Sequence, residues 1–227
     1  MRPTPIPSRA PLGVIIAGGL SRRMRRDGGA EHPMDKTLLD LGGRSLLQHV
    51  IARLGPQVCA LALNSNGPDA DYAGFGLPIC PDTLPDHPGP LAGVLAGMEH
   101  AATQGASHIV TAAGDTPFLP CDLVPRLRLA AEESTSGVAV AASPAAQTAD
   151  TLRLHPTFAL WPVALRDELR ENLRAGHRRM MRFAERHGAA TAGFASPDGA
   201  PDPFFNINTP EDLQRARRWV ARAAPTQ

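Results

Sequence analysis

Residues 13–36, GVIIAGGLSRRMRRDGGAEHPMDK, decide how the rest of the chain is interpreted. A short apolar run reaches the glycine pair Gly18 and Gly19, and an arginine-rich loop follows that ends at Asp35 and Lys36. Paired glycines let backbone N–H groups approach an anion without obstruction by side chains. The stretch has neither the G-K-[ST] of a P-loop nor the G-x-G-x-x-G of a dinucleotide-binding fold. We therefore interpret it as a loop of another type that holds a nucleoside triphosphate.

Lys36 is the single lysine of the sequence, although lysine and arginine together number 23. Arginine fills every other cationic position, so a retained lysine indicates a place where a compact ammonium works and a planar guanidinium does not. The alternative is that Lys36 has no special role and that the bias toward arginine left this one lysine by chance. Its position at the end of the glycine-rich loop favours a function in phosphate binding.

The composition indicates one domain without a strong overall charge. A chain of 227 residues can bury one substantial core, and its 23 basic and 22 acidic residues give no global field that would attract nucleic acid or an anionic membrane. Cys59, Cys80 and Cys121 lack metal-ligand spacing, which predicts reduced, buried thiols. Because no apolar stretch has the length of a signal peptide or a membrane span, we expect a cytoplasmic protein that binds neither nucleic acid nor membrane.

The order of apolar stretches predicts an α/β fold of the Rossmann-like, three-layer α/β/α type, with a mostly parallel sheet in a single domain. Runs of strand length alternate with amphipathic stretches of helix length, as in a sheet covered on both faces. The predicted strands are residues 12–17, 57–63, 77–80, 107–113, 137–142, 155–161 and 189–194. The predicted helices are residues 45–55, 90–104, 122–134, 163–174, 177–187 and 209–221, with Asp122 and Thr209 as N-caps.

Polar residues directly after the predicted strands are the first candidates for a site, because ligands of open parallel sheets bind beyond the carboxyl ends of the strands. Asn64, Asn66, Asp82 and Asp115 occupy such positions. A carboxylate at the place of Asp115 can hold a Mg²⁺ ion that also bridges substrate phosphates. Each of these residues also lies among turn-forming neighbours, so ordinary loop chemistry remains an alternative for all of them.

Two further features lie outside the strand ends. A basic group around a predicted helix start could hold a second phosphate, although runs of charge are usually solvated surfaces; it comprises Arg174, His177, Arg178, Arg179 and Arg182. His155 precedes a proline and has no evident carboxylate partner, which favours a structural role over a catalytic one.

The sequence resembles the molybdenum cofactor guanylyltransferases, which belong to the nucleotide-diphospho-sugar transferase-like superfamily. The matching segments extend over nearly the whole chain apart from its ends. They are Ile16-Ala17-Gly18-Gly19, Ser21-Arg22-Arg23-Met24, Asp35-Lys36, Asn64-Ser65-Asn66, Pro81-Asp82, Gly89-Pro90-Leu91-Ala92-Gly93, Gly114-Asp115-Thr116-Pro117, His155-Pro156-Thr157 and residues 206–213, NINTPEDL.

The resemblance implies a Mg²⁺-dependent enzyme, with Mn²⁺ as a substitute, that transfers GMP from GTP to molybdopterin and releases pyrophosphate. It implies catalytic roles for Arg23, Lys36 and Asp115, and Asp115 as the metal ligand. The implied GTP site comprises Ile16, Ala17, Gly18, Gly19, Arg23, Lys36, Asn64, Asp82, Gly89 and Asp115. The implied molybdopterin site comprises Asn206, Asn208, Arg178 and Arg179. Proteins of molybdenum insertion and molybdoenzyme maturation are the implied partners.

The resemblance also suggests how the chain is divided. From the residues themselves, the proline-rich stretch 1–11 and residues 221–227 are expected to be disordered tails, and residues 12–220 are the expected nucleotidyltransferase domain. Within that domain, residues 12–143 would bind the nucleotide and residues 150–220 the acceptor. The interval 25–34, RRDGGAEHPM, is longer than in the family. We expect the extra residues to extend a lid and to leave Lys36 in its usual place.

Two other functions remain open on the sequence. One is a cytidylyltransferase, or another nucleotidyltransferase, that acts on a small phosphorylated acceptor. The other is a nucleotide-binding protein without catalytic activity that delivers or protects a cofactor. The presence of Lys36, Asp82 and Asp115 together favours an enzyme over this second alternative.

Overall fold

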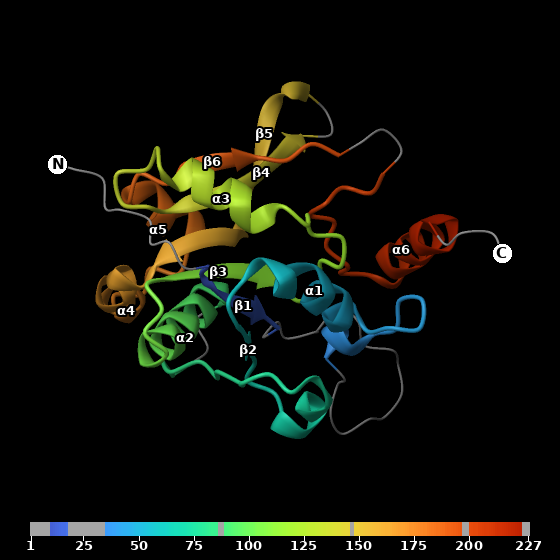
Figure 1. The fold of residues 1–227 in the computed structure, drawn as a ribbon, viewed down its shortest axis with the longest axis horizontal. Helices are drawn as coiled ribbons and strands as arrows, with labels where there is room; N and C mark the ends of the chain where they lie inside the picture. Colours follow the sequence, from blue (N-terminus) through green and yellow to red (C-terminus); the bar gives the residue numbers. More distant parts are fainter. Residues whose placement is uncertain (1–9, 18–34, 86–88, 146–147, 197–199, 224–227) are drawn as a thin grey trace.

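The computed structural model describes residues 10–17, 35–85, 89–145, 148–196 and 200–223 (Figure 1). Its strands form one sheet in the order β2-β1-β3-β5-β4-β6. They are β1 (Leu12–Ile16), β2 (Leu61–Asn64), β3 (His108–Ala113), β4 (Ala139–Ala145), β5 (Thr148–Pro162) and β6 (Ala190–Gly193). Strand β1 pairs in parallel with β2 and β3, and β4 pairs in parallel with β6. Only β5 runs antiparallel to its neighbours, so the mostly parallel sheet is confirmed.

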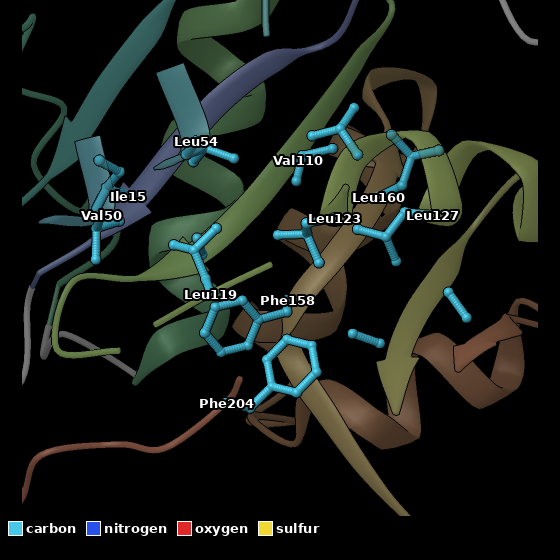
Figure 2. Close-up of a cluster of buried hydrophobic side chains, with 14 of the residues drawn as sticks. Ile15, Val50, Leu54, Val110, Leu119, Leu123, Leu127, Phe158, Leu160 and Phe204 are labelled. Atoms are coloured by element: carbon cyan, nitrogen blue, oxygen red, sulfur yellow. The ribbon is translucent and has the colours of Figure 1, made fainter. Parts of the chain in front are cut away.

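Helices cover both faces of this sheet, which confirms the three-layer α/β/α architecture (Figure 1). The helices are α1 (Leu46–Leu54), α2 (Pro90–Thr103), α3 (Leu123–Ala131), α4 (Arg166–Arg174), α5 (Met180–Arg186) and α6 (Pro210–Ala223). One buried cluster joins the sheet to α1 and α3; Figure 2 shows Val50 and Leu54 from α1 on one side of it and Leu123 and Leu127 from α3 on the other. A second cluster joins the opposite face to α2, α4 and α5. None of the helices in the described ranges is long and apolar enough to cross a membrane.

Local sequence determines where α1 and α6 begin. The Ser45 hydroxyl accepts from the N–H of Gln48, and the Gln48 side chain accepts in return from the N–H of Ser45. At α6 the Thr209 hydroxyl accepts from the N–H of Asp212 at 3.1 Å, and the Asp212 carboxylate accepts from the N–H of Thr209 at 3.0 Å. Both pairs are capping boxes, which satisfy N–H groups that have no partner within the helix. The predicted cap at Thr209 is confirmed.

The predicted side-chain cap at Asp122 is wrong. Asp122 precedes α3, but its side chain makes no capping hydrogen bond. Its carboxylate instead accepts from Nε of Arg126 at 2.6 Å. Arg126 is one helical turn further along, where a guanidinium can reach a residue four positions earlier. This ion pair therefore replaces the cap.

Several element boundaries differ from those predicted, and prolines explain the clearest case. Residues 77–80 form only a single bridge between Leu63 and Ile79 in place of a strand. Pro78 and Pro81 flank that bridge and lack the N–H groups that a longer ladder requires. Strand β2 begins at Leu61, four residues later than predicted, since Gly55–Gln57 form a short 3-10 helix. Helix α6 extends to Ala223, beyond the predicted end at residue 221.

The cysteines are less buried than predicted. Cys80 is buried, and burial raises the pKa of its thiol. Cys59 and Cys121 are exposed, so the prediction of buried thiols is wrong for both. Cys59 lies in the turn before β2 and Cys121 just before α3, where the chain crosses the surface between elements.

His155 has a structural environment in the core. Its Nε2 hydrogen-bonds with the Ser143 hydroxyl at 2.8 Å, and its ring stacks on Phe204 with centroids 4.3 Å apart. Burial, which outweighs the opposing effect of Asp202, lowers the pKa of His155 from 6.5 to about 4. The imidazole is therefore neutral in the folded protein near pH 7. These contacts support the structural role expected from the sequence.

This environment predicts that the protein becomes less stable as the pH falls below 6.5. The unfolded chain takes up a proton at His155 near pH 6.5, whereas the folded chain does so only near pH 4. The free energy of unfolding should therefore fall through this window, by about 2 kcal/mol between pH 7.5 and pH 5. Urea denaturation of the natural chain and of His155→Gln measures this contribution. The glutamine side chain does not titrate, and its amide can still hydrogen-bond with the Ser143 hydroxyl. An equal pH dependence in both proteins would contradict the assignment.

Candidate active site

Lys36, Asp115 and Asn208 meet at the carboxyl ends of β1 and β3. Lys36 begins the 3-10 helix Lys36–Leu38, and its ammonium forms an ion pair with Oδ2 of Asp115. The same ammonium donates to Oδ1 of Asn208 at 2.9 Å, across 172 positions of sequence. Asp115 is only 7% exposed, and Asn208 stands just before α6. The fold thus joins a residue of the loop after β1 to one strand end and to the segment before the last helix.

The backbone around Asp115 is fixed from two sides. The N–H of Gly114 donates to the Ile16 carbonyl at 3.0 Å, and the N–H of Ile207 donates to the Asp115 carbonyl at 3.1 Å. A Cβ atom on Gly114 would lie 2.9 Å from Cγ2 of Thr37, so glycine is required for this close approach. The Thr116 hydroxyl donates to Oδ1 of Asp115 at 3.3 Å. Oδ2 therefore remains directed at the Lys36 ammonium.

Asn64, Asn66 and Asp82 form a second polar cluster, at the end of β2. Nδ2 of Asn64 donates to the Cys80 carbonyl at 2.9 Å and to Oδ1 of Asp82 at 3.0 Å. Nδ2 of Asn66 donates to Oδ2 of Asp82 at 2.9 Å, and Oδ1 of Asn66 accepts from the N–H of Asp82 at 2.8 Å. Both carboxylate oxygens of Asp82 are therefore held by amides. These residues therefore form a hydrogen-bonded cluster with defined partners.

Glycines of α2 complete this second cluster. A Cβ atom on Gly93 would lie 2.2 Å from Oδ1 of Asn64, so only glycine allows the buried Asn64 side chain to lie against the helix. Gly89 precedes α2 with a φ of 88°, a left-handed conformation that glycine adopts without strain. Pro90, the first residue of α2, has no N–H, so the first N–H group within the helix belongs to Leu91. N–H groups at a helix N-terminus favour anions.

The end of β1 lies between the two clusters. The N–H of Ala17 donates to the Asn64 carbonyl at 2.9 Å, while the Ile16 carbonyl accepts from Gly114. The structure therefore brings Ile16, Ala17, Lys36 and Asp115 together, with Asn64 beside Ala17. Gly18, Gly19, Arg23 and the predicted lid at residues 25–34 lie outside the described residues.

The residues predicted to bind the acceptor fall into two separate places. Asn206 and Asn208 are exposed and flank Ile207, which is fully buried against α6 and the segment before α1. Arg178 and Arg179 instead line a cavity of about 720 Å³ between α4 and α5. Helix α5 and helix α6 lie at opposite ends of the sheet in Figure 1. The structure therefore does not bring the two arginines to the two asparagines.

The cavity beside α5 is strongly cationic. It is lined by Asn172, Gly176, His177, Arg178, Arg179, Arg182, Phe183, Glu185 and Arg186. Arg186 donates to Oδ1 of Asn172 at 2.6 Å and lies over the Phe183 ring. Within the described ranges, no carboxylate pairs with Arg178, Arg179 or Arg182. Three exposed guanidinium groups at one cavity favour a negatively charged ligand.

Tyr72 is a component of the site that sequence reasoning missed. Its hydroxyl donates to Oδ2 of Asp35 at 2.8 Å, while Oδ1 of Asp35 accepts from the N–H of Thr37 at 2.7 Å. Asp35 thereby caps the 3-10 helix that begins with Lys36. The available signal was composition, because Tyr72 is the single tyrosine of the sequence.

The oxygen atoms around Lys36 suit a divalent cation. Mg²⁺ usually takes one or two carboxylates from the protein and completes its coordination with phosphate oxygens and waters. Asp115 supplies one carboxylate whose Oδ2 already faces a positive charge, and Oδ1 of Asn208 contacts the same ammonium. The described residues contain no group of three or more His, Cys, Asp or Glu side chains that could hold a metal by themselves. The donors fit a metal that arrives with a phosphate-bearing ligand.

The fold and the site together define a domain of the nucleotidyltransferase class. Residues 13–191 match the family model of the MobA-like NTP transferase domain, and the chain belongs to this family. It is 50% identical over 213 residues to the molybdenum cofactor guanylyltransferase of Cereibacter sphaeroides, with 94% of this chain and 98% of the relative covered. It is 48% identical over 211 residues to the enzyme of the same name from Mesorhizobium japonicum, with 92% of this chain and 95% of the relative covered.

Solved structures support the fold. The molybdopterin-guanine dinucleotide biosynthesis protein A of Archaeoglobus fulgidus superposes with a TM-score of 0.67 at 22% identity, covering 93% of this chain and 99% of the other. The 4-diphosphocytidyl-2C-methyl-D-erythritol synthase of Anaerococcus prevotii reaches a TM-score of 0.68 at 13% identity, covering 94% and 97%. At these identities the likeness concerns the arrangement of strands and helices.

Proposed function

We propose that this protein transfers GMP from GTP to molybdopterin, forming molybdopterin guanine dinucleotide and pyrophosphate. The observation that carries the proposal is the contact of Lys36 with both Asp115 and Asn208. This contact supports the proposal, because a cation suited to the phosphates of a nucleoside triphosphate and a carboxylate suited to a metal lie next to the segment proposed for the acceptor. The relatives at about half identity, named molybdenum cofactor guanylyltransferase, support GTP and molybdopterin as the substrates.

The nucleotide is proposed to lie across the ends of β1 and β2. Its phosphates would lie at Ile16, Ala17 and Lys36, and we keep Gly18, Gly19 and Arg23 as proposed members of this phosphate site. Asn64, Asp82 and Gly89 would bind the guanosine end. A carboxylate is a hydrogen-bond acceptor at both oxygens, and those of Asp82 accept from Asn64 and Asn66. We propose that the carboxylate of Asp82 also accepts from N–H donors of a guanine edge.

The reaction needs positioning and charge neutralisation and no covalent protein intermediate. A terminal phosphate oxygen of molybdopterin attacks the α-phosphorus of GTP, forming a new P–O bond. The bond between the α-phosphorus and the bridging oxygen to the β-phosphate breaks in line, and that oxygen leaves with pyrophosphate. Lys36 and Arg23 offset the negative charge on the phosphates. Asp115 would hold Mg²⁺, or Mn²⁺ in its place, which when bound neutralises phosphate charge.

The acceptor part of the proposal has two components. We propose that Asn206 and Asn208 bind the acceptor, and the contact of Asn208 with Lys36 supports a place for them next to the proposed phosphate site. We retain Arg178 and Arg179 as proposed acceptor residues, supported by their cationic cavity. We further propose that residues 12–143 bind the nucleotide and residues 150–220 the acceptor, and that the enzyme acts in the cytoplasm. Proteins of molybdenum insertion and molybdoenzyme maturation would supply its substrate and receive its product.

Pyrophosphate release with each of the four nucleoside triphosphates, in the presence of Mg²⁺ and molybdopterin, tests this function. We expect release with GTP only, and only when molybdopterin is present. Release with CTP would identify a cytidylyltransferase instead. No release with any nucleotide, combined with measurable GTP binding by calorimetry, would favour a protein that binds nucleotide without catalysis.

The same assay tests the two arginines. Arg178→Ala/Arg179→Ala should raise the KM for molybdopterin roughly tenfold or more, because it removes from the cavity two guanidinium groups that have no carboxylate partner among the described residues. The KM for GTP should remain unchanged. Arg174→Ala is the matched control, since Arg174 is paired with Glu171 and does not line the cavity. An unchanged KM for molybdopterin in the double variant would remove the cavity from the acceptor site.

A further inference from the structure

Tyr72 connects two parts of the site that are distant in sequence. It belongs to the segment after β2, and its hydroxyl reaches Asp35 in the segment after β1. The side chain is 2% exposed and belongs to the core cluster on the α1 and α3 face. Its ring and hydroxyl also lie against Gly67, within 4 Å of where a Cβ atom would stand. The loop that carries Asn64 and Asn66 is therefore linked through one side chain to the residue that precedes Lys36.

The surroundings of the hydroxyl fix its role as a donor. Burial raises the pKa of Tyr72 well above its usual value, so the phenol remains protonated. Its acceptor, Oδ2 of Asp35, belongs to a carboxylate whose other oxygen holds the N–H of Thr37. A carboxylate held at both oxygens cannot rotate without losing a hydrogen bond. Tyr72 therefore determines the orientation of the group that caps the 3-10 helix.

Lys36 is the first residue of that helix. The cap at Asp35 therefore determines the position of the Lys36 backbone, from which the side chain extends. Thr37, the next residue, is 2% exposed and lies against Gly114, the neighbour of Asp115. The hydroxyl of Thr37 is buried without a hydrogen-bond partner among the described residues. The contact from Tyr72 through Asp35 is a polar attachment at the start of this helix.

We propose that Tyr72 is a positioning residue for Lys36. Its hydroxyl fixes Asp35, Asp35 fixes the start of the 3-10 helix, and the helix directs the Lys36 ammonium at Asp115 and Asn208. The effect of this arrangement on turnover rests on the proposed function, in which Lys36 binds phosphate. The predicted effect of Tyr72 on the position of the Lys36 ammonium does not depend on the proposed function. A displaced ammonium should slow the chemical step more than it weakens nucleotide binding, because small errors in the position of a catalytic group are costly.

The variant Tyr72→Phe tests the proposal, since it removes the hydroxyl and keeps the buried ring. Lys36 is the single lysine, so protein labelled with ¹³C and ¹⁵N in lysine gives one side-chain signal that reports on this ammonium. We expect Tyr72→Phe to move this signal toward that of a solvated lysine and to lower kcat roughly tenfold, with the KM for GTP within about twofold of normal. An unmoved Lys36 signal would overturn the proposal.

Two comparisons separate positioning from a loss of stability. Thr111→Val removes the buried hydrogen bond from Trp161 to Thr111, at 3.1 Å, within the body of the sheet. Thr111→Val should lower the urea midpoint without moving the Lys36 signal. If Thr111→Val moved the Lys36 signal as far as Tyr72→Phe does, the result would count against the proposal. Asp35→Asn can still accept from Thr37 and can donate to Tyr72, so it should retain the signal that Asp35→Ala loses. Equal shifts in both Asp35 variants would contradict the pathway through Asp35.

A double-mutant cycle keeps this inference distinct from the proposed function. If Tyr72 acts through Asp35, the kcat of Tyr72→Phe/Asp35→Ala should equal that of Asp35→Ala alone. Additive losses in kcat would show that Tyr72 acts by another route and would overturn the proposal. A shifted Lys36 signal with normal kcat would support the positioning role and would instead remove Lys36 from the proposed catalysis.

Discussion

Replacing Asp115 by Asn should lower kcat by a factor of about 10³ or more, because the substitution removes the charge that holds Lys36 and the proposed metal. Asparagine preserves the size of the side chain and can still accept from Thr116. The fold should therefore be retained, which circular dichroism and the thermal midpoint would verify. Pyrophosphate release under saturating GTP and molybdopterin measures the effect. Turnover close to normal would refute the role of Asp115.

Asp122→Asn is the matched control for this variant. Asp122 is an exposed carboxylate paired with Arg126 on α3, so the same chemical change occurs at a surface ion pair. Exposed pairs contribute about 1 kcal/mol or less to stability, and we expect normal turnover. A calorimetric titration with Mn²⁺ in the presence of GTP adds a readout besides activity. Asp115→Asn should weaken the binding of Mn²⁺ at least tenfold, whereas Asp122→Asn should leave it unchanged.

Replacing Lys36 by Arg should lower kcat by roughly 10²-fold even though the positive charge is kept. The ammonium fits between Oδ2 of Asp115 and Oδ1 of Asn208 as a compact donor to both. A guanidinium is planar, longer and fixed in its hydrogen-bonding directions, so it cannot occupy the same position. Lys36→Met, which removes the charge and keeps most of the length, should lose more activity than Lys36→Arg.

The comparison of these two variants determines what the site requires of Lys36. If Lys36→Arg were as active as the natural chain, charge alone would suffice, and the single lysine would be an accident of composition. Arg174→Lys is the control for the exchange itself, because Arg174 forms an exposed ion pair with Glu171 on α4. It should leave both turnover and the thermal midpoint within error of the natural chain.

Much of the fold was predictable because local patterns determine it. The capping boxes at Ser45 and Thr209 need only neighbouring residues, and both helices begin where the sequence places them. The α/β layering was predictable because apolar runs of strand length alternate with amphipathic stretches of helix length. The antiparallel direction of β5 could not be predicted, since a buried strand has the same apolar pattern in either direction. The side-chain cap at Asp122 failed because Arg126 competes for the carboxylate.

The candidate site, like the fold, has a part that could be predicted from the sequence and a part that depends on the tertiary structure. The sequence by itself determined the chemistry of Lys36 and Asp115, because composition marks one and a strand end marks the other. Only the tertiary structure decided that they meet with Asn208, that Tyr72 holds Asp35, and that Arg178 and Arg179 line a separate cavity. The physical reason is that residue types and local spacing determine hydrogen-bonding capacity and helix ends. Contacts between residues far apart in sequence depend on how the sheet is ordered and how its helices pack.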